Sequence, residues 1–233
     1  MARGSGICLT LLLTGVLSCP CMLEANPAPE PLAGGTVAAR SPHKTIRMEA
    51  EEVTIRLGKG TYAVEGVYHM FNSGEATTEW VDFPKGRERE MPDGWDYPNF
   101  IQFHAWVDGK KVPFTKDRRE WLAGQVTFPG HATTIIRVVY EVNYPVVAVY
   151  GGDYAEYIVG TGSLWKDSIG KALFTVDGSE IGGTEYFDAE LKAPRSHKLR
   201  SEHVVRIEVS DFKPQRDATL FIKIKDQRKA AEK

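Results

Sequence analysis

The sequence contains few cysteines, and all of them lie within its first 25 residues: Cys8, Cys19 and Cys21. This N-terminal stretch predicts a secretion signal at residues 1–25, because Arg3 precedes an uncharged run at 7–17 that is too short to cross a bilayer as a helix. If cleavage follows Ala25, the mature chain has no cysteine. That absence excludes a disulfide, a thiol nucleophile and a zinc site built on cysteine.

The signal offers two processing sites, which lead to different locations. Cleavage after Ala25 would release the mature protein into the periplasm or the extracellular space. The stretch 16–19 is instead similar to a lipobox, in which Cys19 would be acylated and would anchor the protein to the envelope membrane. Pro20 and Cys21 directly after it are unusual for a lipobox. We therefore expect an exported, soluble protein, with lipid anchoring at Cys19 as the alternative.

Neither charge sign is in strong excess. Without Arg3 and Glu24, the 29 basic and 31 acidic residues of the chain become 28 and 30. A nucleic-acid-binding domain would carry a strongly basic balance, so we expect no nucleic-acid partner. The six histidines include no H-x-H or H-x-x-x-H pair, and no motif predicts a bound group, so we expect neither a metal nor a cofactor.

Helical periodicity is scarce, and period-two alternation dominates instead. Residues 26–43 are rich in proline, glycine and alanine and are expected to form a mobile leader. Beyond them, short alternating runs are separated by glycine and proline about every ten residues. The pattern predicts an all-β fold, as an antiparallel β-sandwich or as two packed β-subdomains. It divides into a first β region at 44–145, a second at 146–225 and a polar tail at 226–233.

Local signals mark where the strands turn or break. Lys59-Gly60 and Asn72-Ser73-Gly74 predict turns, and Asp108-Gly109 is the strongest hairpin signal in the chain. Residues 116–123 form the one short helix that we predict, with Thr115 as its cap and Gly124 as its stop.

Several segments resemble a known family, in order along the chain. They are Leu32-Ala33-Gly34-Gly35 with Ile46–Val53, Val67–Gly74 reaching Phe83-Pro84, Tyr157–Lys171, and Asp211–Asp217. These segments are similar to an exported bacterial family known as domain of unknown function 4424, over about residues 32–224. Asp167-Ser168 stands where its pattern has Gly-Pro, and the cysteine before its last strands is absent. The resemblance implies export and a β fold, and it implies no catalytic residue.

No catalytic motif stands out in the mature sequence. Ser163 lacks the G-x-S-x-G elbow of a serine hydrolase, and neither His197 nor His203 has a recognisable orienting carboxylate motif. The remaining candidates are dispersed acids, namely Asp153 and Glu156 with Asp93 and Asp96. A glycosidase would need two such carboxyl groups roughly 5–10 Å apart across a cleft.

An aromatic loop at 84–99 is the strongest candidate for a binding surface. Trp95 lies there between Asp93 and Asp96, with Tyr97 close behind. An indole flanked by acids and a tyrosine can stack on a sugar ring while the carboxylates bond its hydroxyls. The alternative is that Trp95 folds back and closes the end of the sandwich.

Three other tryptophans are expected to be structural. Trp80 and Trp106 lie in predicted strands, where a sandwich commonly buries its aromatic side chains. Trp165 lies between glycine turns and is expected to anchor them.

The sequence therefore favours a non-enzymatic exported β-protein with a role in envelope interaction or assembly. Its expected partner is an envelope protein or a glycan. The alternative is an envelope hydrolase or carbohydrate-binding protein that uses the loop acids and Trp95. Contact with a membrane is expected only if Cys19 is lipidated.

Overall fold

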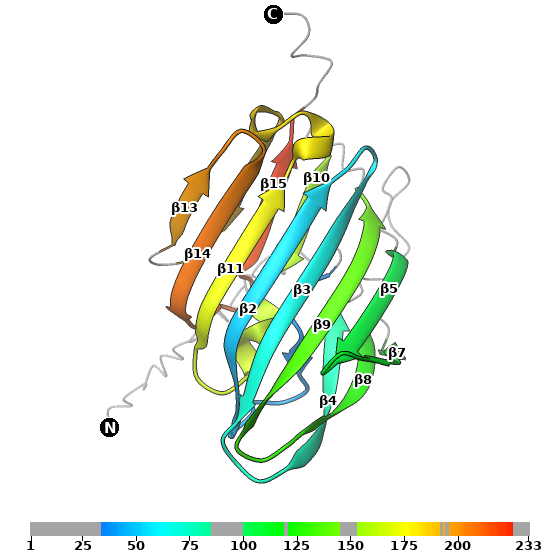
Figure 1. Ribbon diagram of the computed structural model, residues 1–233, viewed down its shortest axis with the longest axis vertical. Coiled ribbons are helices and arrows are strands. Elements are labelled where there is room, and N and C mark those ends of the chain that lie inside the picture. The colour runs from blue at the N-terminus through cyan, green and yellow to red at the C-terminus, as the bar shows by residue number, and fades with distance from the viewer. Residues whose placement is uncertain are drawn as a thin grey trace, which may run out of the picture.

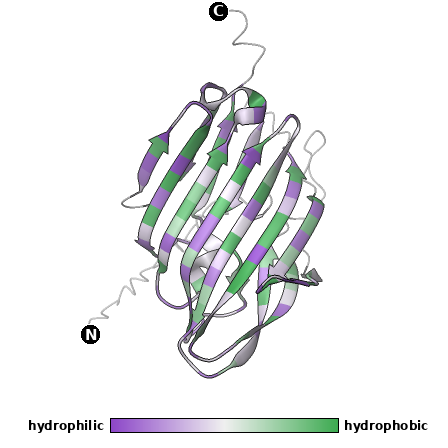
Figure 2. Cartoon of the chain, viewed as in Figure 1, coloured by the Kyte–Doolittle hydropathy of each residue, from purple (hydrophilic) through white to green (hydrophobic). Residues whose placement is uncertain are grey.

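The computed structural model describes residues 34–84, 100–118, 121–144, 153–191, 193 and 196–225. These residues form an all-β protein with two layers of strands (Figure 1). Period-two alternation explains the layers, because it places the apolar side chains of a strand on a single face. Figure 2 shows this alternation along the strands of the front sheet.

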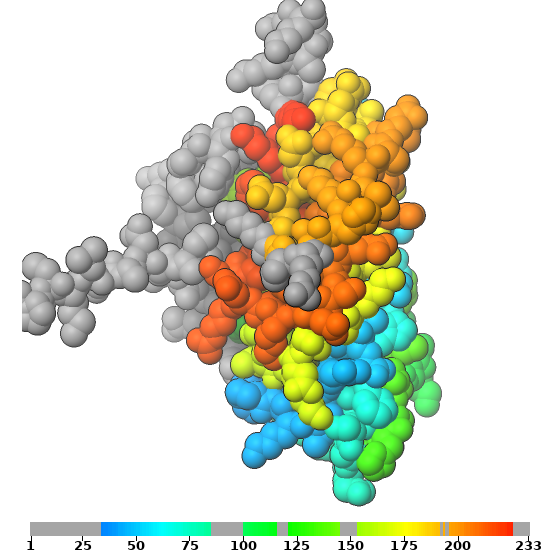
Figure 3. All heavy atoms as spheres, turned by 90° about the vertical axis from the view of Figure 1, so that its left-hand side faces the viewer, coloured from blue at the N-terminus to red at the C-terminus, as the bar shows by residue number. Residues whose placement is uncertain are grey.

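An eight-stranded sheet forms the first layer. Its strands in spatial order are β13 (His197–Arg200), β14 (Val204–Phe212), β11 (Ile169–Asp177), β2 (Ile46–Leu57), β3 (Thr61–Asn72), β9 (Ala132–Asn143), β5 (Phe100–Val107) and β6 (Lys110–Val112). Neighbouring strands are antiparallel except β11 and β2, which run parallel. Figure 3 turns the molecule so that the edge formed by β13 and β14 faces the viewer.

The eight-stranded sheet takes strands from both regions expected from the sequence. β2 belongs to the region at 44–145 and β11 to the region at 146–225, yet the two strands pair directly. Buried side chains from both regions also form one hydrophobic cluster. The described chain is therefore one sandwich, and the alternative of two packed subdomains does not hold.

Two smaller sheets form the second layer. One has the order β1 (Ala38–Ala39), β4 (Thr77–Pro84), β8 (Trp121–Phe128) and β7 (Thr115–Arg118), and the other has the order β10 (Tyr154–Ile158), β15 (Thr219–Ile224) and β12 (Phe187–Leu191). Short 3-10 helices lie in the connections: η2 (Gly160–Leu164), η3 (Ser179–Ile181) and η4 (Thr184–Tyr186). Fully buried aromatic rings, including Phe83, Phe128 and Phe174, belong to the core of the sandwich.

Residues 34–40, which we name the strap, join the two smaller sheets. Gly35 forms a parallel bridge with Ile158 of β10, and Ala38–Ala39 forms the short strand that pairs with β4. Residues 34–39 are buried. The expectation of a mobile leader at 26–43 is therefore wrong for this part of it.

Close packing explains why this glycine-rich stretch belongs to the fold. A Cβ atom at Gly34 would lie 2.1 Å from the Tyr140 hydroxyl oxygen, and one at Gly35 would lie 2.4 Å from the Ile158 carbonyl oxygen. Only glycine allows the backbone to approach these groups so closely. The two glycines therefore mark a contact and not a flexible segment.

The predicted helix at 116–123 is wrong. β7 and β8 form an antiparallel pair there, and β8 is paired with β4 along its whole length. Gly124, the expected helix stop, lies inside β8, where a Cβ atom would come 2.6 Å from the Phe114 ring. Pairing with β4 thus overrides the local helical pattern.

The predicted turns are confirmed. Gly60 joins β2 to β3 with a φ of 86°. Asp108 and Gly109 have φ values of 46° and 77°, and a two-residue type I′ hairpin requires positive φ at both positions. Asn72 closes the next turn, because its Oδ1 accepts a hydrogen bond from the Gly74 N–H at 3.0 Å.

Two of the family-like segments pack against each other and against the strap. The Lys213 Nζ donates to the Trp165 carbonyl oxygen at 2.9 Å, and a Cβ atom at Gly160 would lie 2.2 Å from the Arg216 carbonyl oxygen. Trp165 is buried and donates from Nε1 to the Val37 carbonyl oxygen of the strap at 2.7 Å. Trp165 is therefore a structural anchor, as expected.

Candidate binding site

The loop that we expected to bind a ligand lies outside the described residues. Asp93, Trp95, Asp96 and Tyr97 all fall there, and so does Cys19. Their proposed roles in ligand binding and lipidation stay predictions.

Two of the dispersed acids, Asp153 and Glu156, are described. Asp153 is exposed directly before β10, and Glu156 lies half-buried within that strand. The Asp153 carbonyl oxygen accepts from the Ile224 N–H at 2.9 Å, which extends the strand pairing to this residue. Asp153 lies near Tyr144 and Glu156 near Tyr62, and the rings of these two tyrosines stack at 5.4 Å. Burial raises the pKa of Glu156 to about 7.

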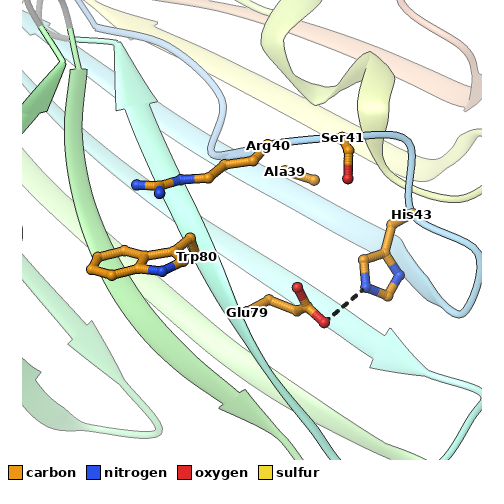
Figure 4. A pocket seen from close by; sticks show the side chains of 6 residues that line it. All are labelled: Ala39, Arg40, Ser41, His43, Glu79 and Trp80. Carbon is orange, nitrogen blue, oxygen red and sulfur yellow. Dashed lines mark ion pairs between the residues drawn. The ribbon is translucent and has the colours of Figure 1, made fainter.

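A pocket lies where the chain leaves the strap. It is lined by Ala39, Arg40, Ser41, His43, Glu79 and Trp80 (Figure 4). The strap and the residues after it supply one wall, and β4 supplies the other. The pocket encloses about 80 Å³, whereas small-molecule sites generally enclose about 300–1,000 Å³. It therefore has room for one side chain or a group of similar size.

His43 is held by backbone amides on one side and lies beside Glu79 on the other. Its Nδ1 accepts from the N–H groups of Thr45 at 3.2 Å and Ile46 at 2.9 Å. A nitrogen that accepts carries no proton, so the ring is neutral and its proton is on Nε2, 3.6 Å from Glu79 Oε1. His43 therefore does not neutralise the charge of Glu79.

This geometry also argues against hydrolysis at the pocket. A serine nucleophile needs a histidine nitrogen that accepts its proton, and the Nδ1 of His43 already accepts from two amides. Ser41 lines the pocket, but no hydrogen bond joins it to His43 within the described part of the chain. The pocket offers binding groups and lacks an activated nucleophile.

Arg40 and Trp80 stack at the other end of the pocket. The guanidinium carbon of Arg40 lies 4.4 Å from the Trp80 ring centre, within range of a cation–π interaction. The Nε of Arg40 donates to Asp82 Oδ1 at 3.0 Å, which forms an ion pair. Trp80 is 41% exposed, so the expectation that it lies in the core is wrong. Trp106 is not a core residue either, because it is half-buried beneath the Arg137 guanidinium.

The pocket straddles the edge of β4. Glu79 and Trp80 are consecutive in a strand, so their side chains point to opposite faces. A pocket lined by both side chains lies at the strand edge, next to the backbone. β1 pairs with β4 only at 81–82, and no described strand pairs with 77–80 on that side.

The register shows which peptide groups face this open edge. The Pro84 carbonyl oxygen accepts from the Gly34 N–H at 3.0 Å, so the residue 84 carbonyl faces the strap. Alternate residues of a strand direct their N–H and C=O groups to the same side, and the β4–β8 register has no shift. The peptide groups of Trp80 and Thr78 therefore face the open edge. No hydrogen bond joins them to a described residue on that side.

A buried polar cluster lies beneath the strap. Glu51 is fully buried, and its Oε1 accepts from Thr36 Oγ1 at 2.6 Å and from the Tyr157 hydroxyl at 2.7 Å. The Tyr68 hydroxyl lies 2.9 Å from that of Tyr157. Burial raises the pKa of Glu51 to about 7, although the two hydrogen bonds lower it in part. Because Thr36 belongs to the strap, this cluster fastens the wall of the pocket to the eight-stranded sheet.

Little in the sequence indicates the pocket, because most of its lining residues lie in the segment expected to be a leader. One signal was available in β4 itself. Its first half, Thr77-Thr78-Glu79-Trp80, contains three polar residues, and the structure shows that this half is partly exposed whereas Val81–Pro84 are buried. Such a change within one strand indicates that the strand extends beyond the core.

Metal binding and membrane spanning can be assessed for the described residues. Among them, no group of three or more His, Cys, Asp or Glu side chains is placed to hold a metal ion. The pocket contributes one imidazole, His43, and one carboxylate, Glu79, and structural zinc sites almost always have four ligands. Within the same ranges, no helix is long and apolar enough to cross a membrane.

Comparison with solved structures supports the fold. A protein from Legionella pneumophila that is provisionally described as nutrient-binding has a TM-score of 0.63 at 19% identity, covering 82% of this chain and 70% of that chain. An M1 zinc metallopeptidase from Deinococcus radiodurans has a TM-score of only 0.42 at 9% identity, covering 78% of this chain and 43% of that chain. No protein-family model and no curated protein sequence matches. At this identity, the likeness to the Legionella protein shows a shared all-β fold.

Proposed function

We propose that this chain is a non-enzymatic β-sandwich protein that binds a partner protein in the cell envelope through the pocket at β4. The observation that carries the proposal is a side-chain-sized pocket at an open strand edge, next to an exposed tryptophan. Tryptophan and arginine are the residue types most enriched at interface hot spots, and here Trp80 and Arg40 stack on each other. A pocket of this size suits one anchoring side chain of a protein partner.

The envelope location rests on the sequence. The signal at 1–25 and the resemblance to an exported family both favour export, and the cysteine-free remainder needs no disulfide in an oxidising compartment. Release after Ala25 is favoured over an anchor at Cys19. The description of the Legionella neighbour as nutrient-binding is in keeping with a binding role and does not identify a ligand.

Hydrolase and sugar-binding functions have less support from the described residues. His43 has no free basic nitrogen, because its Nδ1 accepts two amide hydrogen bonds. A sugar ring would stack on Trp80, but the pocket beside it encloses only about 80 Å³, well below the size of a usual small-molecule site. A single side chain of a protein partner fits that volume.

Site-specific photo-crosslinking in native cells tests this proposal. A benzoylphenylalanine at Thr78, which is exposed on β4, should give a discrete crosslinked protein species, and Trp80→Ala should abolish it. The same group at Arg206, which is exposed on β14, is the matched control and should give none. Equal crosslinking at both positions, no crosslink at Thr78, or a product that contains only glycan would overturn the proposal.

A further inference from the structure

The open edge of β4 also indicates what kind of partner segment can bind there. Thr78 and Trp80 each direct an N–H and a C=O to the same side, two residues apart. Each strand residue rises about 3.3 Å, so these pairs of groups are about 7 Å apart. An extended peptide presents its own N–H and C=O groups along one edge at the same interval, at every second residue. Unpaired strand edges act as templates for such a segment.

We propose that the partner is bound as an extended peptide segment that pairs with β4 at Thr78 and Trp80 and places a lysine or arginine side chain in the pocket. This inference rests on the proposed function and names the class of its partner. Main-chain hydrogen bonds to the strand edge provide the affinity, and the pocket beside the edge provides the specificity.

The charges of the pocket favour a basic side chain. Arg40 is ion-paired with Asp82, and His43 is neutral because its Nδ1 accepts two amide hydrogen bonds. Glu79 therefore contributes a charge that the described pocket residues do not neutralise. Its Oε1 accepts from Thr77 Oγ1 at 2.8 Å, which orients the carboxylate, and its side chain is 38% exposed. An ammonium or guanidinium group in the pocket would form a charge-assisted hydrogen bond with it.

The strap limits the length of the added segment. It occupies the β4 edge at 81–82 and then departs, so that Arg40 and Ser41 form the wall opposite Glu79 (Figure 4). An added strand can therefore pair with 77–80 and cannot continue past Trp80. The expected epitope is a short extended stretch with one basic residue at its centre.

Synthetic heptapeptides test this inference by fluorescence anisotropy. The probe is fluorescently labelled TVTKTVT. One matched probe carries norleucine in place of lysine. Two further probes carry N-methyl groups on alternate amides, one along the first edge of the extended peptide and the other along its opposite edge. The parent should bind, and the norleucine probe should bind about tenfold more weakly. N-methylation on the side that faces β4 should cost about tenfold or more, whereas N-methylation on the other side should cost little.

Protein variants provide the matched controls. Glu79→Gln should weaken binding of the lysine peptide about tenfold and leave the melting temperature unchanged. Glu52→Gln, a similar change at an exposed position of β2, should leave binding unchanged.

The results separate this inference from the proposed function. Strand addition is overturned if both N-methylated probes bind like the parent. It is also overturned if the parent does not bind at millimolar concentration. In either case the proposed function stands as long as Thr78 still crosslinks to a protein. If neither crosslinking nor peptide binding occurs, both fail. A concentration-dependent dimer that Trp80→Arg abolishes would make a second copy of this chain the occupant and would also overturn the inference.

Discussion

Protonation of Glu51 should contribute about 3 kcal/mol to the change of this protein's stability with pH. The side chain is fully buried, Oε1 accepts from Thr36 and Tyr157, and Oε2 has no hydrogen-bond partner within the described structure. Desolvation is the main cause that raises the pKa of Glu51 from an ordinary 4.5 to about 7. The titratable groups around it are tyrosines, Tyr68, Tyr140 and Tyr157, whose own pKa values are also raised by burial.

The sign of the effect follows from proton binding. The folded state binds the Glu51 proton more tightly than the unfolded state, so the stabilisation from this group is fully present below pH 4.5. It is lost as the pH rises from 4.5 to about 7, because above that pH the fold holds a buried carboxylate whose desolvation is only partly offset by its two hydrogen bonds. The difference between the two pKa values corresponds to about 3 kcal/mol of unfolding free energy.

Urea denaturation between pH 4.5 and pH 8 measures this effect in the wild type and in Glu51→Gln. The glutamine keeps an acceptor oxygen for Thr36 and Tyr157 and cannot ionise. Over this range, the unfolding free energy of the wild type should therefore fall by about 3 kcal/mol more than that of the variant. Glu156, whose pKa burial also raises, titrates in both proteins and does not contribute to this difference. The exposed neighbour change Glu52→Gln should keep the wild-type dependence. Identical pH dependence in the wild type and Glu51→Gln would refute the reasoning.

Three other changes test the anchoring role of Trp165, the close contact between Gly160 and Arg216, and the route of export. Trp165→Phe removes the indole N–H that donates to the Val37 carbonyl oxygen and should lower the unfolding free energy by about 1–3 kcal/mol in urea denaturation; an unchanged midpoint would contradict the anchor role. Gly160→Ala places a Cβ atom 2.2 Å from the Arg216 carbonyl oxygen, so calorimetry should show a clearly lower melting temperature, and a wild-type value would show that the backbone can move apart. Cys19→Ala should leave release of the mature protein unchanged, and incorporation of a palmitate analogue that depends on Cys19 would instead establish the lipid anchor.

Features that depend on local chemistry could be predicted from the sequence. Period-two alternation is a property of each strand alone, which is why the all-β class follows from it. The hairpin at Asp108-Gly109 requires only that these two residues adopt positive φ, which both do. Trp165 can be recognised as an anchor because glycine residues flank it in the sequence.

Features that depend on distant partners could not be predicted. Gly34 and Gly35 resemble a flexible linker by composition, and only the approach of Tyr140 and Ile158 shows that they are packed tightly. The helix expected at 116–123 was wrong because β4, far away in the sequence, pairs with this segment.

The candidate site depends on the same long-range pairing. The open edge at 77–80 exists because β1 is only two residues long and covers β4 at 81–82 alone. No local pattern shows where a neighbouring strand ends. The exposure of Trp80 and its position beside Arg40 follow from that end point, so they appear only once the sheets are assembled.

Strand addition to β4 through the peptide groups of Thr78 and Trp80 can be observed directly. Amide NMR of the full chain, titrated with the lysine heptapeptide, measures this residue by residue. The amide protons of Thr78 and Trp80 should shift and become protected from hydrogen exchange, while those of Glu79 and Val81, which face β8, should change little. Protection that does not alternate along β4, or shifts confined to the indole of Trp80, would contradict it.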